Sequence, residues 1–204
     1  PAGAGAMPRP PAATELLAAR DAAGWLPEAA AAILAQTFRD FEFLAVDDGS
    51  RDDTPRILRA LADLRGRVLT LPEPRGLAEA LNAGLAEARS DTIVRMDADD
   101  ACPPDRLARL LPAFHASGAD VMGTGARLMS PRGRLLEAVP VPADHDGIVR
   151  ALFAGRNALL HPTVAFRREA VLRHGGYDPF FREGSQDFDL WVRMSRDARF
   201  ANLP

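Results

Sequence analysis

Short apolar runs alternate with amphipathic stretches through the first 117 residues, and this alternation constrains the fold more than any other feature. Parallel strands need a crossover between them, usually a helix, so the pattern predicts an α/β fold with a mainly parallel sheet flanked by helices. The predicted strands cover residues 14–19, 41–46, 67–71 and 92–96, and the predicted helices cover residues 24–36, 54–64, 77–89 and 105–115.

The alternation becomes irregular after residue 117. Apolar stretches at 121–129 and 135–139 flank Pro131-Arg132-Gly133 and predict a β-hairpin. A strand at 163–167 and a helix opening near Ser185 follow. We therefore expect a flexible lead-in at 1–12, a regular half at 13–117 and a smaller mixed half at 118–204.

Composition and charge exclude several classes of protein. The 204 residues include one cysteine, Cys102, so no internal disulfide can form, and a net charge of −3 gives no electrostatic footprint for nucleic acid. No apolar run approaches the roughly 20 residues that cross a bilayer, and the first residues lack the apolar segment of a signal peptide. We expect a cytoplasmic protein, compatible with peripheral contact at the inner face of a membrane.

Carboxylates follow two of the predicted strands directly. Asp47 and Asp48 end one strand, and Asp97, Asp99 and Asp100 follow another. In an open α/β sheet, ligands bind beyond the carboxyl ends of the strands, so both clusters should face one crevice. Hard oxygens grouped in this way suit Mg²⁺ or Mn²⁺.

Turns and helix caps offer an alternative explanation for these aspartates. For the pair at the first strand end, that alternative carries equal weight. For the second cluster it carries less, because three carboxylates within four residues repel one another unless a cation lies among them. Asp100 is the member that we assign to a cap or turn.

Four segments together resemble a known family. They are Ile33-Leu34-Ala35-Gln36-Thr37-Phe38 with Asp40-Phe41-Glu42, Val46-Asp47-Asp48-Gly49-Ser50, Met96-Asp97-Ala98-Asp99-Asp100, and Gly184-Ser185-Gln186-Asp187-Phe188-Asp189-Leu190-Trp191. In this order and spacing they resemble family 2 glycosyltransferases of the GT-A fold, which are nucleotide-sugar-dependent and generally inverting. The resemblance runs from about residue 18 to residue 204. It implies a nucleotide-sugar-binding first half and an acceptor-side second half.

The resemblance implies the residues that bind the donor. Asp48 would bind the nucleobase, which is uracil in many members, so a UDP-sugar is the expected donor. Asp99 would hold Mn²⁺ or Mg²⁺, with Asp97 beside it on the ribose side.

The first nucleotide loop departs from the family pattern. Ala18-Ala19-Arg20-Asp21 stands where many relatives carry Pro-x-Tyr-Asn or Pro-x-Arg-Asn. From this loop we expect Ala18 and Arg20 at the donor, the guanidinium stacking on the base; a solvated arginine is the alternative. Arg75 lies at a third strand-to-helix junction and either reaches the donor or is simply an exposed loop residue.

The acceptor side is expected near the fourth segment. Asp187 occupies the place of the family's catalytic base, which takes a proton from the attacking hydroxyl. Gln186 stands where relatives usually have Glu and is assigned to the acceptor or the diphosphate. His161 opens a segment found in a subset of relatives and is assigned in the same way, with a structural histidine as the alternative.

The sequence thus predicts an inverting transferase that moves a sugar from a nucleoside-diphosphate-sugar to the hydroxyl of a glycan, lipid-linked or other acceptor. A catalytically silent sugar-nucleotide- or partner-binding domain is one alternative. A sugar nucleotidyltransferase is another, although residues 18–21 lack the Gly-rich basic loop that a triphosphate requires. Relatives continue past the equivalent of Pro204, so we expect a C-terminal truncation.

Overall fold

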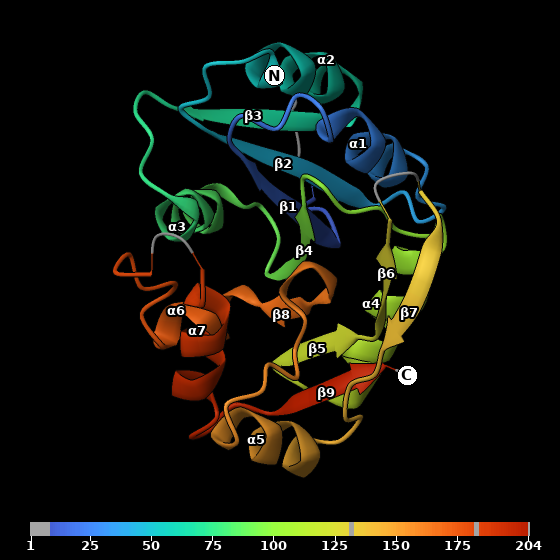
Figure 1. The fold of residues 1–204 in the computed structure, drawn as a ribbon, viewed down its shortest axis with the longest axis vertical. Coiled ribbons are helices and arrows are strands. Elements are labelled where there is room, and N and C mark those ends of the chain that lie inside the picture. Colours follow the sequence, from blue (N-terminus) through green and yellow to red (C-terminus); the bar gives the residue numbers. More distant parts are fainter. Residues whose placement is uncertain (1–8, 131–132, 182–183, 204) are drawn as a thin grey trace, which may run out of the picture.

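The computed structural model describes residues 9–130, 133–181 and 184–203, and its centre is a seven-stranded sheet in the order β3-β2-β1-β4-β8-β5-β9 (Figure 1). Its strands are β1 (Ala13–Ala19), β2 (Phe41–Asp48), β3 (Gly66–Leu71), β4 (Thr92–Asp97), β5 (Val121–Thr124), β8 (Ala165–Arg167) and β9 (Phe200–Leu203). Among these described strands only β8 runs against the others, pairing antiparallel with β4 and with β5. The mainly parallel sheet predicted from the sequence is confirmed.

Helices cover both faces of this sheet (Figure 1). They are α1 (Leu26–Leu34), α2 (Thr54–Arg65), α3 (Leu77–Glu87), α4 (Arg106–Ser117), α5 (His145–Phe153), α6 (Arg168–Arg173) and α7 (Gln186–Met194), with a short 3₁₀ turn η1 (His161–Thr163). Because successive strand residues point to opposite faces, Leu16 packs with α3 and α7, whereas Leu17 packs with α1, α2 and α4. The chain is therefore a three-layer α/β/α structure.

The alanine-rich first strand is central in the sheet. β1 lies between β2 and β4 and is buried along its whole length. The helix above it approaches closely, since a Cβ added to Gly84 of α3 would lie 2.4 Å from Leu16. Glycine at that position is what lets α3 lie directly on β1 and β2.

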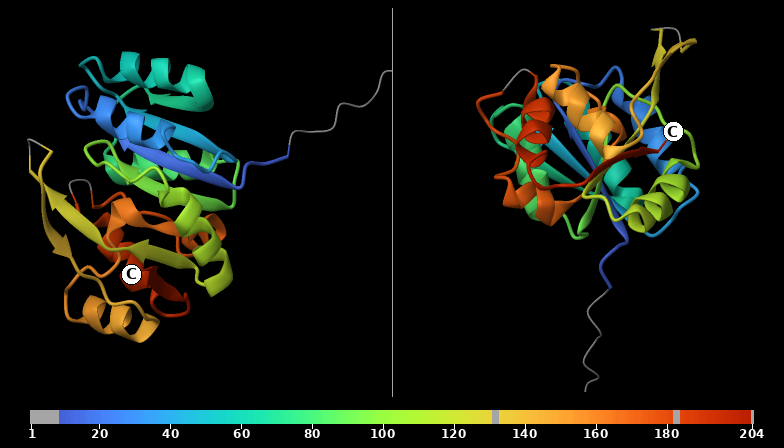
Figure 2. Two further views of the ribbon diagram at one scale, coloured as in Figure 1. Left: turned by 90° about the vertical axis from the view of Figure 1, so that its right-hand side faces the viewer. Right: turned by 90° about the horizontal axis from the view of Figure 1, so that it is seen from below.

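The hairpin prediction was partly wrong. The stretch predicted as one strand at 121–129 divides into β5, which joins the main sheet, and β6 (Ala126–Met129), which pairs antiparallel with β7 (Leu135–Val139). The division falls at Gly125, where the buried side chains of β5 give way to the largely exposed ones of β6. The β6–β7 pair projects from the body of the molecule (Figure 2). The expected turn residues Pro131 and Arg132, and most of the expected lead-in, lie outside the described residues.

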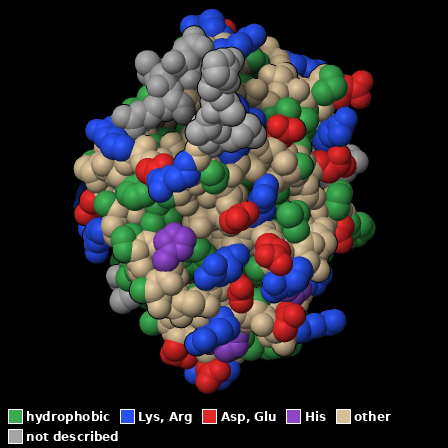
Figure 3. Space-filling view, turned by 180° about the vertical axis from the view of Figure 1, so that it is seen from behind, with side chains coloured by type: hydrophobic (Ala, Val, Ile, Leu, Met, Phe, Trp, Pro, Cys, Tyr) green, Lys and Arg blue, Asp and Glu red, His purple; other side chains and the backbone are tan. Residues whose placement is uncertain are grey.

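Charged side chains of both signs are interspersed on the face drawn in Figure 3. Across the described ranges, no helix has the length and apolar character to cross a membrane.

Candidate active site at the carboxyl ends of the strands

The two aspartate clusters lie at one edge of the sheet because their strands run parallel on either side of β1. Ala18 of β1 is in register with Val46 of β2 on one side and with Asp97 of β4 on the other. Asp48 ends β2 and Asp97 ends β4, so both carboxylates come to the carboxyl edge, where open α/β sheets bind ligands.

Three carboxylates converge after β4. One oxygen from each of Asp97, Asp99 and Asp100 lies within 4.8 Å of the others. Burial raises the pKa of Asp100 to about 6, and the charges of Asp97 and Asp99 add to the rise. Asp100, assigned to a cap or turn from the sequence, thus contributes a third oxygen. A set of hard oxygens this close together fits Mn²⁺ or Mg²⁺.

Asp48 holds the loop between β3 and α3. Its carboxylate is buried and accepts hydrogen bonds from the backbone N–H of Arg75 at 2.7 Å and of Gly76 at 2.9 Å. The Arg75 side chain is exposed at this junction. The loop that carries Arg75 is therefore fixed to the end of β2.

The first loop is tied to the second. The Asp21 carboxylate accepts the backbone N–H of Arg51 at 2.7 Å, and the Asp21 N–H donates to the Ser50 hydroxyl. Arg20 is half-exposed, with Nε 3.8 Å from the Asp21 carboxylate. Ala18 is buried, and its side chain belongs to the core on the α3 face. Arg20 thus presents a half-exposed guanidinium at this loop.

Asp187 lies in the first turn of α7 and accepts a hydrogen bond of 2.6 Å from the Asn157 amide. Burial raises the pKa of the neighbouring Tyr177 hydroxyl, and the charges of Asp187 and Asp97 both add to the rise. Met96 packs in the core with α1 and α4, so the next side chain, Asp97, points to the opposite face of the sheet, where α7 packs. The expected base and Asp97 therefore lie on the same side of the sheet.

Gln186 and His161 lie deeper than the sequence suggests. Gln186 is buried, and its Oε1 has no hydrogen-bond partner within the described part of the chain. His161 is buried too, and its Nε2 lies 2.9 Å from the Tyr177 hydroxyl. Burial, together with the charge of Arg95, lowers the pKa of His161 well below its usual value. The hydrogen bond to Tyr177 thus supports the alternative that His161 has a structural role.

Three residues near the site were not recognised as such from the sequence. The Asn157 amide donates to Asp187, the Tyr177 hydroxyl bonds His161, and Arg95 pairs with Asp97. Asn82 of α3 accepts the Tyr177 N–H at 2.9 Å and donates to its carbonyl at 2.7 Å. Arg95 stands two residues before the Asp-x-Asp segment, but only the structure shows that it is buried.

A cavity of about 530 Å³ opens beside the acidic cluster. Asp100 and Cys102 line its near end, Arg106 and Arg109 of α4 one wall, and the β6–β7 hairpin another. The site therefore has free space next to its carboxylates.

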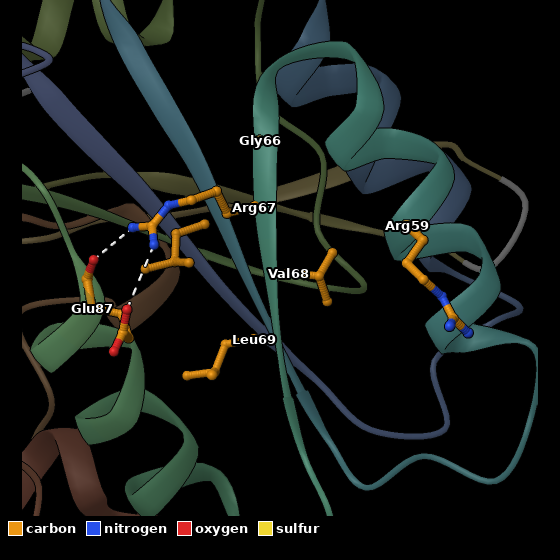
Figure 4. Close-up of a pocket in the computed structure, with 7 residues that line it drawn as sticks. Arg59, Gly66, Arg67, Val68, Leu69 and Glu87 are labelled. Carbon is orange, nitrogen blue, oxygen red and sulfur yellow. Dashed lines mark hydrogen bonds and ion pairs between the residues drawn. The ribbon is translucent and has the colours of Figure 1, made fainter. Parts of the chain in front are cut away.

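A second cavity of about 430 Å³ lies elsewhere, along the start of β3 (Figure 4). Arg67 and Glu87 meet at its side, their charged groups 3.6 Å apart. Gly66 pairs with Phe43, near the opposite end of β2 from Asp48, so this cavity is not part of the site.

The fold and the carboxylates at its ligand-binding edge define an α/β domain of the GT-A class. Residues 16–138 match the model of the family described as glycosyl transferase family 2. The chain belongs to that family and is a glycosyltransferase domain.

Relatives by sequence include enzymes of polysaccharide biosynthesis. The O-antigen biosynthesis glycosyltransferase WbnJ of Escherichia coli is 32% identical over 179 residues, which cover 84% of this chain and 68% of the relative. The succinoglycan biosynthesis protein ExoO of Rhizobium meliloti is 36% identical over 131 residues, which cover 64% of this chain and 38% of that protein.

Solved structures share the fold at low identity. S. aureus TarS 1–349 in complex with UDP-GlcNAc has a TM-score of 0.74 at 18% identity, covering 94% of this chain and 55% of that one. The mannosyltransferase PcManGT of Pyrobaculum calidifontis, in complex with GDP-Man and Mn²⁺, has a TM-score of 0.72 at 24% identity, covering 97% and 56%. The chain thus spans little more than half the length of these two structures.

Proposed function

We propose that the chain transfers a sugar from a nucleoside-diphosphate-sugar, with a UDP-sugar as the preferred donor, to an acceptor hydroxyl with inversion. The observation that carries the proposal is the convergence of Asp97, Asp99 and Asp100 at the carboxyl edge of parallel strands. Family membership supports the same chemistry over the nucleotidyltransferase alternative.

The donor would bind across the ends of β1, β2 and β4. Asp48 ends β2, and Arg20 and Arg75 lie on the loops that follow β1 and β3; all three are proposed to contact the nucleotide. The complexes of TarS with UDP and UDP-GlcNAc, and of PcManGT with GDP-Man, support a nucleotide-sugar as the donor.

Asp99 and Asp97 are proposed to hold the divalent cation, Mn²⁺ or Mg²⁺. When bound, such a cation neutralises the charge of the diphosphate leaving group. The protein's own contribution is to keep several carboxylate oxygens together in spite of their repulsion, since β4 and the turn after it hold them in place. The Mn²⁺ in the PcManGT complex supports this choice of ion.

Asp187 is proposed as the base that takes the proton from the attacking hydroxyl. The Asn157 amide bonds one carboxylate oxygen and leaves the other free for the acceptor. A single in-line displacement then needs no covalent intermediate and inverts the anomeric centre. Gln186 and His161 are both buried, and they are proposed to line the part of the site that receives the acceptor or the diphosphate.

The acceptor is proposed to be a glycan or a lipid-linked glycan, as the names of WbnJ and ExoO suggest. Peripheral contact with the inner face of a membrane would suit such an acceptor and is proposed on that ground alone.

Two substitutions test the mechanism. Asp99→Asn should abolish Mn²⁺-dependent binding of a UDP-sugar, measured by calorimetry. Asp187→Asn should keep that binding and lower the rate of transfer or donor hydrolysis by 10²–10⁴-fold, the usual contribution of a positioned base. Asp189→Asn is the matched control, because Asp189 is bonded to Arg193 on the same helix. Full transfer by Asp187→Asn would reject the assigned base.

A further inference from the structure

A fully buried arginine lies beneath the acidic cluster. Arg95 is on β4, two residues before Asp97, and its side chain points to the same face of the sheet. Its backbone carbonyl accepts a hydrogen bond of 2.7 Å from Arg106, which fixes this part of the strand. An arginine does not lose its proton in a protein, so the position carries a permanent positive charge out of contact with water.

Arg95 has one acidic partner among the described residues. Its Nη2 donates to Oδ1 of Asp97 and its Nη1 to the carbonyl of Met96, whereas its Nε has no hydrogen-bond partner in the described ranges. His161 and the Tyr177 hydroxyl bond each other, and the charge of Arg95 disfavours a proton on that imidazole.

We propose that Arg95 is a positioning residue of the metal site, which holds Asp97 by one oxygen and keeps the affinity of the free cluster for a divalent cation low. The inference rests on the proposed function, because it assumes that Asp97 and Asp99 receive the cation. Arg95 engages Oδ1 of Asp97, and no hydrogen bond from Arg95 to Oδ2 is found. The consequence is that the cation binds well only together with the diphosphate.

The charges give the physical reason. The three carboxylates of the cluster offer up to three negative charges, and Arg95 cancels one of them from inside the protein. A buried charge is screened far less than an exposed one, so it acts strongly on a cation a few ångströms away. A nucleoside diphosphate supplies the negative charge that Arg95 removes. Mn²⁺ and UDP should therefore bind with strong mutual enhancement.

The test measures Mn²⁺ binding to the whole chain by electron paramagnetic resonance, with and without UDP. Arg95→Met fills the same space without the charge, and it should bind Mn²⁺ alone at least about tenfold more tightly than wild type. The enhancement of Mn²⁺ binding by UDP should shrink in that variant. Arg95→Lys keeps the charge, so its affinity for Mn²⁺ alone and the enhancement of that affinity by UDP should both lie within twofold of wild type.

Arg109→Met is the matched control. Arg109 lines the same cavity as Asp100, but it is exposed and solvent screens its charge. The Mn²⁺ affinity of the Arg109→Met variant should stay within twofold of wild type. If Arg95→Met binds Mn²⁺ equally or more weakly than wild type, the proposal is overturned.

Arg95→Gln, which removes the charge but keeps a hydrogen-bond donor, decides the question if Arg95→Met fails to fold, as judged by far-UV circular dichroism. Tighter binding of Mn²⁺ alone by Arg95→Gln than by wild type supports the proposal, and equal or weaker binding overturns it. Failure of the proposed function looks different, since a wild-type chain that shows no Mn²⁺-dependent UDP-sugar turnover would reject the function. If the wild-type chain turns over the UDP-sugar but Arg95→Met leaves the affinity for Mn²⁺ unchanged, only the role of Arg95 is rejected.

Discussion

Glu15 and Arg106 form an ion pair inside the protein, with Arg106 Nη1 2.8 Å from Glu15 Oε1. Burial raises the pKa of Glu15, and the neighbouring Arg106 opposes that rise. Arg106 also donates to the carbonyls of Arg95 and Pro162, so it joins the start of α4 to three other parts of the chain. Loss of either partner would leave a buried charge without compensation.

A double-mutant cycle tests this pair. Arg106→Met should lower the free energy of unfolding by about 3–5 kcal/mol, because Glu15 is then buried alone. The double variant Glu15→Met with Arg106→Met should recover much of that loss, since two apolar side chains replace two charges. Urea denaturation measures all four proteins. Additive losses in the double variant would show that the two side chains do not act as a pair.

His161 predicts a pH dependence of stability. Its pKa in the folded protein is depressed by burial, so the native state stays neutral where the unfolded chain takes up a proton below about pH 6.5. The unfolded state then binds more protons, and the free energy of unfolding falls as the pH falls, by up to about 1.4 kcal/mol per unit for this one group. The stability is fully present above pH 6.5.

The comparison is between wild type and His161→Gln from pH 7.5 to pH 5. Wild type should lose stability faster on acidification, and the difference between the two curves isolates His161 from the carboxylates. Parallel curves would mean that His161 titrates normally in the folded state.

The acidic residues of the site were accessible from the sequence because their geometry is local. Asp97 and Asp99 follow one strand, and a spacing of two residues after a strand suffices to group them. Tyr177 and Asn157 were not accessible as site residues, because their contacts join segments that are far apart in the chain. Asn82, for example, contacts Tyr177 across 95 residues. No local pattern encodes such a contact.

At the scale of elements, the turn after α6 depends on a helix from the other half of the chain. Gly175 and Gly176 have φ of +82° and +70°, a region that glycine adopts readily. A Cβ on Gly176 would lie 2.6 Å from Oδ1 of Asn82, the atom that accepts the Tyr177 N–H. A Cβ on Gly175 would meet open space. An added side chain would strain the backbone at both positions, but only at Gly176 would it also disturb the contact with α3.

Alanine substitutions at Gly175 and Gly176 compare the effect of backbone strain alone with the effect of strain plus the lost contact to Asn82. Gly175→Ala should lower the free energy of unfolding by about 1–2 kcal/mol through the left-handed conformation alone. Gly176→Ala should lower the free energy of unfolding by about 1–3 kcal/mol more than Gly175→Ala does, because the new Cβ displaces the Asn82 amide from the Tyr177 backbone. Urea denaturation measures both variants. Equal losses would show that the Asn82 contact contributes nothing to the turn.

The strands and helices of the first half were predictable because each is a single amphipathic or apolar segment between turn residues. The stretch at 121–129 was not, because β5 and β6 are both apolar and only Gly125 separates them. Which sheet a strand joins is decided by its partners. β5 pairs with β8 and β9, which lie more than 40 residues further along. The same limit applies to β8, whose insertion beside β4 no local signal predicts.

At the scale of the whole molecule, one core crosses the proposed division at residue 117. The cluster on the α3 face contains Leu16 and Leu81 from the first half, and Phe166 and Trp191 from the second. β8 of the second half lies in the sheet between β4 and β5. Either half alone would expose this shared apolar surface to water, which is unfavourable in proportion to its area.

The chain should therefore unfold in one cooperative transition, and its two tryptophans provide the test. Trp25 is 56% exposed in the first half, whereas Trp191 is fully buried in the second. In a Trp25→Phe variant, fluorescence reports Trp191 alone, and far-UV circular dichroism reports the helices and strands of both halves. The two urea curves should share one midpoint, since coincident transitions by different probes mark two-state unfolding. A Trp191 transition at lower urea would show that the second half unfolds separately. Coincidence would make residue 117 a boundary between donor-side and acceptor-side roles within one folding unit, so that substitutions in either half, such as those at Arg106 and Gly176, destabilise the whole site.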